Sequence, residues 1–348
     1  MFTKLLVPLD GSALAEQALG QAAAIARASG ASIDLVSVHE QIAHDGYGEA
    51  QVDHRRWNDE HRYLETIAAE LASGGGIRVT HSMMGGDPQE MICRRAADVD
   101  ADLIVITSHG RTGFSRTWFG SVADGLVRHA PTSLLILRPI AGDARRAAAH
   151  HLFKKVLVPL DGSMLAGEIL STVSNLARCG NASISLLGVV QPLLASAFEP
   201  ASLLPYSFLL RDGTAIAHLV EDATNDLQAV ADRLHAEGTT PVDSHVVVTQ
   251  NVAHGVIEFA RSHDVDLIAM STHGRGTSRY FVGSVADKVL RASGLPMLLR
   301  RSVPAAYLAP GPQIEAALPK RSSAPPQSSQ TDDDDPSFIR NNDGALFV

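Results

Sequence analysis

Two glycine-containing segments of the chain have the composition of a phosphate-binding loop. The first reads SHGRTG over residues 108–113, and six further residues separate it from Gly120-Ser121. Gly110 and Gly113 permit a tight turn and a close approach of the backbone to a ligand. Gly120 and Ser121 would begin a helix, and the free N–H groups and dipole of a helix N-terminus bind anions. The Ser121 hydroxyl could add a hydrogen bond or contact a Mg²⁺, so the expected chemistry is phosphate binding.

An acidic residue follows the first apolar run of the chain. Residues 4–12 read KLLVPLDGS, and Asp10 closes the run just before a Gly-Ser turn. A carboxylate repels phosphates, but it could accept hydrogen bonds from a ribose or a base. The combination predicts a site with a phosphate end and a nucleoside end. The chain has neither GxxxxGK[ST] nor GxGxxG, which excludes a P-loop and a dinucleotide fingerprint.

Three sequence blocks occur twice, in the same order. KLLVPLDGS (4–12) returns as KVLVPLDGS (155–163), DLIVITSHGR (102–111) as DLIAMSTHGR (266–275), and GSVAD (120–124) as GSVAD (283–287). Such a recurrence indicates an internal repeat. We therefore predict one domain over 1–140, a linker rich in Ala and Arg over 141–151, and a second domain over 152–302. Residues 303–348 carry Pro, Ser, Gln and an acidic run, which predicts a disordered tail.

Each copy reads as an alternation of strands and helices. Buried strands are predicted from apolar runs, and helices from apolar periodicity, from Ser12 and Asp87-Pro88 as start signals, and from Gly30 as a stop signal. The alternation predicts an α/β fold, with a parallel sheet and helices on both of its faces. Ligands of such sheets bind at the carboxyl ends of the strands, where Asp10 and the glycine loop fall. The predicted elements of the first copy are strands at 4–9, 32–38, 77–83, 102–107 and 133–138, and helices at 12–30, at 53–72, from 87 and from 120.

The overall composition narrows the class of protein. A formal net charge of −9 over 348 residues argues against general nucleic-acid binding, which needs a basic face. No apolar stretch is long enough to span a bilayer, and the first residues are too polar for a signal peptide. We expect a cytoplasmic protein that binds neither nucleic acid nor membrane.

Side chains that could bind a transition metal are sparse. His54 and His61 share one predicted helix, but they lie seven residues apart and no third ligand is evident. Cys93 and Cys179 lack the Cys-x-x-Cys spacing of a zinc site and are too few for a disulfide framework. The sequence therefore predicts no metal site, and the two cysteines are expected to be buried in helices.

Charged residues inside the loops have two candidate roles each. The loop histidines could donate to a phosphate or accept a phosphoryl group, although a simple hydrogen-bonded loop residue is favoured. The loop arginines could pair with a phosphate or stay solvated, and these alternatives remain open. The residues concerned are His109 and His273, and Arg111 and Arg275.

The combination VPLDGS, DLIVI, SHGRTG and GSVAD resembles the universal stress protein family over nearly all of both copies. The resemblance implies two Rossmann-like domains, each with a five-stranded parallel sheet of order 3-2-1-4-5. It also implies ATP binding through a motif of Gly, two residues, Gly, nine residues, and Gly-Ser or Gly-Thr. In the first copy Thr107 replaces the leading glycine, and nine residues separate Gly110 from Gly120.

The resemblance implies a binding site in each copy. In the first copy, phosphates and ribose would contact Gly110, Gly113, Gly120, Ser121 and Val122, and adenosine would contact Pro8, Asp10 and Val38. The second copy departs from the motif, because Ser271 replaces the leading glycine and only eight residues separate Gly274 from Gly283. The first copy is therefore the better candidate. The matching residues of the second copy are Pro159, Asp161, Val189, Gly274, Gly283 and Ser284.

Three hypotheses for the function remain open. The favoured one is a stress-response protein whose bound ATP, with or without Mg²⁺, alters which protein partner it engages. A slow ATPase or phosphotransferase is less favoured, because the loop carries no paired carboxylate and no P-loop lysine, and Asp124 and Asp287 read as acids at helix starts. The third is a pairing module that binds no nucleotide. ADP, AMP or a cyclic nucleotide could fit a similar site.

Pairing between domains is a further expectation from the family. Its fifth strands commonly pair edge to edge, so residues 133–138 and 296–301 could join the two copies into an internal pseudo-dimer, which covers exposed sheet edges. A homodimer is an additional alternative. The apolar insertion at 191–210 could cover the nucleotide or bind a partner, although packing on its own domain is slightly favoured.

Overall fold

The structure is a computed structural model that describes residues 1–40, 47–108, 120–139, 152–192, 213–238, 241–272 and 283–301. The predicted linker at 141–151, the tail at 303–348 and most of the insertion at 191–210 lie outside the described residues. The domain boundaries drawn from the sequence therefore remain a prediction.

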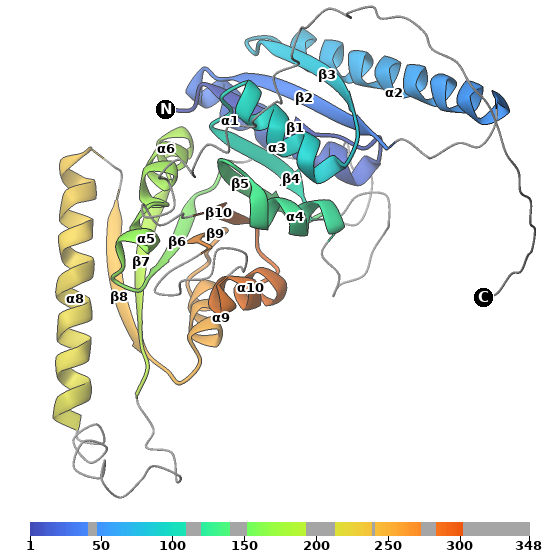
Figure 1. The fold of residues 1–348 in the computed structure, drawn as a ribbon. Helices are drawn as coiled ribbons and strands as arrows, with labels where there is room; N and C mark the ends of the chain where they lie inside the picture. The colour runs from blue at the N-terminus through green and yellow to red at the C-terminus, as the bar shows by residue number, and fades with distance from the viewer. Residues whose placement is uncertain are drawn as a thin grey trace, which may run out of the picture. The chain divides into compact units, whose positions relative to one another are not determined.

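The first copy alternates five strands with four helices among its described residues (Figure 1). The apolar runs predicted as strands all form strands, with ends shifted by up to two residues. The second helix begins earlier than its apolar stripe suggested. The elements are β1 (Lys4–Pro8), α1 (Ala13–Ser29), β2 (Ser32–His39), α2 (Tyr47–Ser73), β3 (Val79–Gly85), α3 (Pro88–Asp98), β4 (Leu103–Thr107), α4 (Ser121–His129) and β5 (Ser133–Leu137).

The second copy follows the same order with one local difference. Two shorter helices, α5 and α6, stand where the first copy has the single helix α1. The elements are β6 (Lys155–Leu160), α5 (Met164–Gly167), α6 (Leu170–Gly180), β7 (Ser183–Val190), α8 (Gly213–Ala236), β8 (Val242–Val248), α9 (Val252–Ser262), β9 (Leu267–Ser271), α10 (Ser284–Ala292) and β10 (Met297–Arg300).

The ten strands of the described residues form one sheet, in the order β3-β2-β1-β4-β5-β10-β9-β6-β7-β8. Within each copy every strand pairing is parallel, and the order is the expected 3-2-1-4-5. The copies meet where β5 pairs antiparallel with β10, with Leu135 opposite Leu298. The predicted pairing of the two fifth strands is therefore confirmed.

Two apolar cores lie on opposite faces of this sheet. Buried side chains of α1, α2, α6 and α8 pack on one face, and those of α3, α4, α9 and α10 pack on the other. Because most sheet positions are covered on both faces, the strands read as continuous apolar runs. Leu5, Leu103 and Leu135, for example, are fully buried.

Local signals explain where the helices begin and end. The Ser12 hydroxyl accepts a hydrogen bond from the Ala15 N–H at 3.1 Å, and the Asp87 carboxylate accepts one from Glu90 at 3.0 Å. Gly30 ends α1 with a φ of 76°, in the left-handed region that favours glycine. None of the helices that the structure describes is both long and apolar enough to cross a bilayer.

The aspartate that opens the repeated DLI block has a structural role. Asp102 accepts hydrogen bonds from the N–H groups of Thr3 and Lys4 at 2.6 and 2.9 Å. Asp266 does the same for Lys154 and Lys155 at 2.7 and 3.0 Å. In both copies this carboxylate holds the start of the first strand beside the fourth, so the repetition of this residue needs no catalytic explanation.

Candidate functional site

A cavity of about 250 Å³ lies at the carboxyl ends of β1 and β4 in the first copy. Strand ends, the start of α4 and parts of α2 and α3 surround it, which is the expected location for a ligand in a doubly wound sheet. The lining residues are Pro8, Leu9, Asp10, Ala15, Val36, Val38, Glu40, Arg56, Pro88, Ile92, Ile106, Thr107, Ser108, Gly120, Ser121, Val122 and Ala123.

The turn after β1 holds an acidic group on the edge of this cavity. The Asp10 carboxylate accepts a hydrogen bond from the Ser12 N–H at 2.9 Å, and Ser12 in turn caps α1. Gly11 between them has a φ of 79°, which a glycine adopts without strain. The sequence Asp-Gly-Ser thus serves both to start the helix and to fix the carboxylate beside the cavity.

The start of α4 carries the backbone groups that the sequence predicts to bind an anion, with one correction to that expectation. The Gly120 N–H is not free, because it donates to the Ser108 carbonyl oxygen at 2.9 Å. The first bond within the helix runs from the Asp124 N–H to the Gly120 carbonyl at 2.9 Å. The amides of Ser121, Val122 and Ala123 therefore have no acceptor inside the helix. Gly120 has no side chain to cap them, and all three residues line the cavity.

The outer wall of the cavity is stabilised by a buried histidine on β2. His39 is 1% exposed; its Nδ1 lies 2.7 Å from Glu60 and its Nε2 lies 2.8 Å from Asp53, both on α2. Burial by itself lowers the pKa of His39, but the hydrogen bonds and charges of the two carboxylates outweigh it and raise the pKa above the usual value. Arg56, which lines the cavity, donates to Glu60 at 3.0 Å.

The structure brings together six of the eight residues predicted for the first site. Gly110 and Gly113 lie outside the described residues, as do His109 and Arg111. The segment that contains them leaves β4 at Ser108 and returns at Gly120, and both of these residues line the cavity. The six residues found at the cavity are Pro8, Asp10, Val38, Gly120, Ser121 and Val122.

Some lining residues were not predicted from the sequence. Glu40 and Arg56 come from the end of β2 and from α2, and Pro88 and Ile92 come from α3. No motif marks them, because their presence depends on how the helices pack beside the strand ends. Pro88 was recognised as a helix start, but its position beside a site could not be inferred.

The second copy places the matching residues at equivalent strand ends. The Asp161 carboxylate accepts hydrogen bonds from the N–H and the hydroxyl of Ser163, at 3.0 and 2.6 Å. The Gly283 N–H donates to the Thr272 carbonyl at 2.6 Å, and a Cβ at Gly283 would lie 2.8 Å from that oxygen, which explains the glycine. Pro159 and Val189 are the last residues but one of β6 and β7, and Ser284 opens α10. Gly274, His273 and Arg275 lie outside the described residues.

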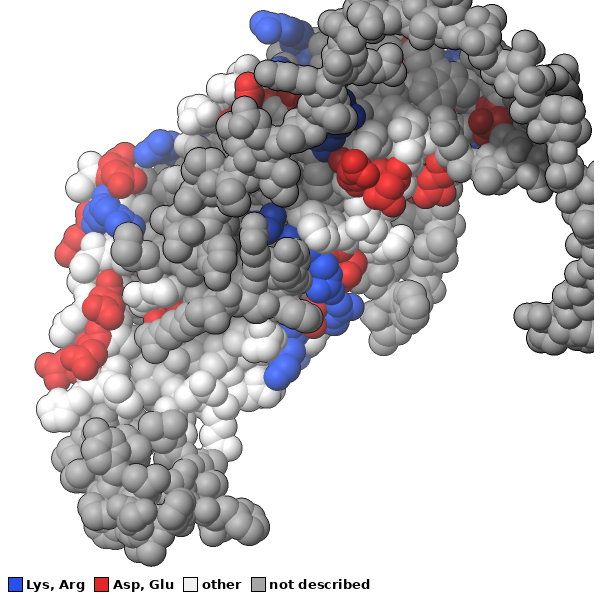
Figure 2. All heavy atoms as spheres, in the orientation of Figure 1, with Lys and Arg blue, Asp and Glu red and all other residues white. Residues whose placement is uncertain are grey.

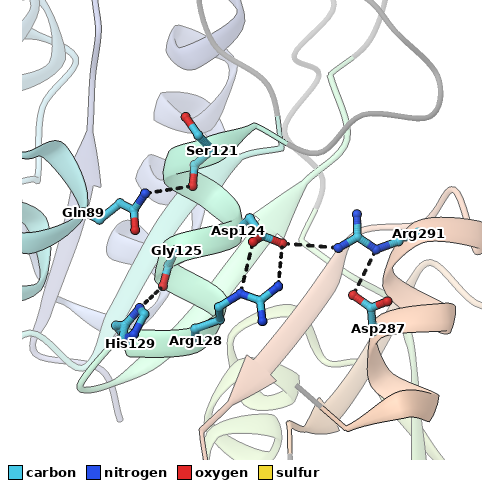
Figure 3. A network of polar contacts seen from close by, with 8 residues as sticks. All are labelled: Gln89, Ser121, Asp124, Gly125, Arg128, His129, Asp287 and Arg291. Atoms are coloured by element: carbon cyan, nitrogen blue, oxygen red, sulfur yellow. Dashed lines mark hydrogen bonds and ion pairs between the residues drawn. The ribbon is translucent and has the colours of Figure 1, made fainter. Parts of the chain in front are cut away.

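A polar network connects α4 of the first copy to α10 of the second copy (Figure 3). On α4, Asp124 pairs with Arg128 at 3.1 Å and with Arg291 of α10 at 3.3 Å. Arg291 also pairs with Asp287 on its own helix at 2.9 Å. As predicted, Asp124 and Asp287 lie in the first turns of their helices. The cross-copy contact was not predicted, because no sequence pattern shows which side chains of α4 and α10 meet once β5 pairs with β10.

The two cysteines are only partly buried. Cys93 lies on α3 and Cys179 on α6, so their expected location in helices is confirmed but complete burial is not. Burial raises the pKa of the Cys93 thiol to about 11 and also raises the pKa of Cys179. Both thiols are therefore protonated near neutral pH and poorly suited to nucleophilic chemistry.

Comparison with known proteins identifies the type of domain. A model of the universal stress protein family matches residues 1–138 and again residues 152–301. A protein named as a universal stress protein from Staphylococcus saprophyticus is 30% identical over 141 residues, which cover 39% of this chain and 84% of that protein.

Solved structures with the same arrangement extend over both copies. A universal stress protein from Archaeoglobus fulgidus has a TM-score of 0.63 and 18% identity, and the match covers 86% of this chain and 98% of the other. A universal stress protein from Pseudomonas aeruginosa has a TM-score of 0.56 and 17% identity, covering 86% of this chain and 94% of the other. At this level of identity the likeness shows the fold alone.

Proposed function

Because the chain belongs to the universal stress protein family, we propose that it is a stress-response module that binds an adenine nucleotide, with ATP in the first copy. The observation that carries this proposal is the cavity that joins Asp10, Val38 and the start of α4. The second copy is a weaker candidate, because its loop between Gly274 and Gly283 is one residue shorter.

The chemistry of the cavity fits the parts of a nucleotide. Val36, Val38, Ile92 and Ile106 provide apolar walls for a base. Asp10 provides an acceptor for ribose or base N–H and O–H groups. The amides of Ser121 to Ala123 and the dipole of α4 would hold the phosphates, and the Ser121 hydroxyl is the group that would contact a Mg²⁺.

Local groups, rather than a broad electrostatic field, would provide this anion binding. On the face drawn in Figure 2, the acidic and basic side chains of the described residues lie interspersed. The whole chain carries a formal charge of −9. Phosphate affinity would therefore depend on the oriented backbone amides at one helix start, which act at short range.

The helix that would hold the phosphates also contacts the second copy. Ser121 and Val122 line the cavity, and one turn later Asp124 pairs with Arg291. A ligand that shifts the first turn of α4 would change this contact, which supports a module whose contacts respond to nucleotide binding. Engagement of Asp124 by two arginines also argues against its use as a catalytic base for ATP hydrolysis.

The phosphate end can be tested by Ser121→Asp, measured by calorimetry with ATP and with adenosine. A carboxylate in the first helical turn suits the helix dipole, so the fold should persist, but it would repel phosphates. We expect ATP affinity to fall by about 10-fold or more, which corresponds to about 1.4 kcal/mol, whereas adenosine affinity changes little.

Ser284→Asp is the matched control in the second copy. If the first copy is the main site, this variant should bind ATP like the unmodified protein. No ATP binding by the unmodified protein, or equal losses for ATP and adenosine in Ser121→Asp, would refute the proposed role of α4. Phosphate release measured in parallel would favour the hydrolase alternative only if it decreases in Ser121→Asp.

A further inference from the structure

Three side chains of the first copy, His61, Glu65 and His81, converge outside the nucleotide cavity. Their ligand atoms all lie within 4.8 Å of one another. The His61 Nδ1 lies 3.6 Å from the Glu65 carboxylate, and the rings of His61 and His81 have centroids 5.9 Å apart. None of the three residues lines the cavity described above.

The fold explains why these residues meet. His61 and Glu65 are four residues apart on α2, so they lie on the same face of the helix. On β3, Val79 and Met83 pack into the core that contains Leu64 of α2. His81 lies two residues from each, and strand side chains alternate between faces, so it points to the same side as they do. Packing of α2 against β3 thus positions the third group.

The set of two imidazoles and one carboxylate suits a particular class of ion. Zn²⁺ binds nitrogen and carboxylate ligands, and two histidines with one glutamate is a known three-ligand set for it. Mg²⁺ prefers oxygen ligands and retains its waters, so it fits this set poorly. We propose that His61, Glu65 and His81 bind a zinc ion, which would connect α2 to the edge strand β3.

The second copy provides an internal comparison. Leu64 of α2 and Leu227 of α8 are buried at equivalent positions, and both helices end six residues before the next strand. On this alignment Thr224, Gln228 and Ser244 replace the three ligands. These side chains are polar but bind zinc weakly, so the proposed site belongs to the first copy only.

The groups are accessible to an ion from solvent. The side chains of His61 and Glu65 are 44% and 53% exposed. A helical His–Glu pair is also present in the second copy, where His218 lies 3.9 Å from Glu221, with side chains 78% and 71% exposed. Among the described residues this pair is not part of a three-ligand group. It is therefore a suitable control for zinc binding by a surface pair alone.

The test is a calorimetric titration of the full chain with zinc chloride, after treatment with a chelator and without an affinity tag. We expect one equivalent of zinc, and a thermal unfolding midpoint that rises with zinc concentration. His81→Ser and Glu65→Gln introduce the residues of the second copy. Each should weaken zinc binding by at least about 10- to 100-fold, the range seen when even a supporting partner of a metal ligand is lost.

His218→Ser should leave the zinc affinity unchanged. Circular dichroism checks that each variant folds, and because the altered side chains lie on the surface of α2 and β3, little change is expected. The proposal would be overturned by an absence of zinc binding in the unmodified chain. It would also be overturned if His81→Ser and Glu65→Gln bound zinc as tightly as the unmodified chain, because the ion would then be held elsewhere.

Discussion

The two copies have the same strand order, but they differ in the buried polar side chains where the helices pack against the sheet. In the first copy the Asp34 side chain, 1% exposed, accepts hydrogen bonds from Arg95 at 2.7 and 3.1 Å. In the second copy Ser185 and Phe259 stand at the equivalent positions of β7 and α9. Phe259 stacks on His263 instead, with ring centroids 3.8 Å apart.

A second difference concerns the strand end beside the cavity. His39, held between Asp53 and Glu60, ends β2, whereas Val190 ends β7. Both copies nevertheless bury their apolar positions in the same pattern along these two strands. The comparison teaches that the shared apolar positions suffice for the sheet order. The ionic groups of the first copy are an addition that ties α2 and α3 to the strands around the cavity.

The largest expected difference between the copies is the loss of unfolding free energy caused by Asp34→Ala. The change leaves the Arg95 guanidinium without its buried partner, and breaking a buried ion pair in this way costs about 3 kcal/mol of unfolding free energy. Ser185→Ala is the matched change, and it should cost nothing, because the Ser185 hydroxyl is buried without a hydrogen-bond partner among the described residues. Urea titration measures both. Equal losses of unfolding free energy in the two variants would show that the ion pair between Asp34 and Arg95 does not stabilise the first copy.

The next largest effect is a pH dependence of the unfolding free energy, which should arise from the first copy only. The pKa of His39 is raised in the folded chain, so protonation favours folding. This stabilisation is complete below the pKa of an unfolded histidine, about 6.5, and is lost as pH rises through the folded pKa. The groups facing His39 are Asp53, Glu60 and Trp57 of α2, with Arg56 beside Glu60.

His39→Val introduces the residue of the second copy and isolates this effect. The unmodified chain should lose unfolding free energy relative to the variant as pH rises above about 6.5, as measured by urea titration at each pH. NMR titration of the His39 ring gives the folded pKa directly. If both proteins had the same pH dependence, the pair of carboxylates would not act on His39 as inferred.

The smallest effect concerns the contact between the copies. Arg291→Ala removes a partly exposed ion pair with Asp124, and such pairs contribute about 0.2–1 kcal/mol. A double-mutant cycle with Asp124→Ala isolates the pairwise energy. Arg128→Ala is the control, because it removes the pair within α4 and keeps the pair between the copies. A coupling energy indistinguishable from zero would mean that this ion pair does not stabilise the contact between the copies.

Much of the fold and of the site was predictable because the relevant signals are local. Apolar runs, the Ser12 and Asp87 caps and Gly30 mark the element ends, and the repeated blocks mark the carboxyl ends of the strands. Of the six residues that the resemblance implied and that line the cavity, five lie in these blocks, and Val38 lies in the second predicted strand. The prediction of a free N–H at Gly120 was wrong. This group donates to the Ser108 carbonyl oxygen, which lies twelve residues away along the chain, so no local pattern could show the bond.

The sequence by itself determined the repeat, the alternation of strands and helices and the expected location of a site at the strand ends, since these depend on apolar patterning and on short turn motifs, whereas the strand order was implied only by the family resemblance. Only the tertiary structure decided which polar groups meet. His61 shows no third ligand along its own helix, yet packing of α2 on β3 brings His81 to it. Arg291 reaches Asp124 only because β5 pairs with β10. Contacts of this kind leave no local pattern, because each joins residues on elements that are far apart in the chain.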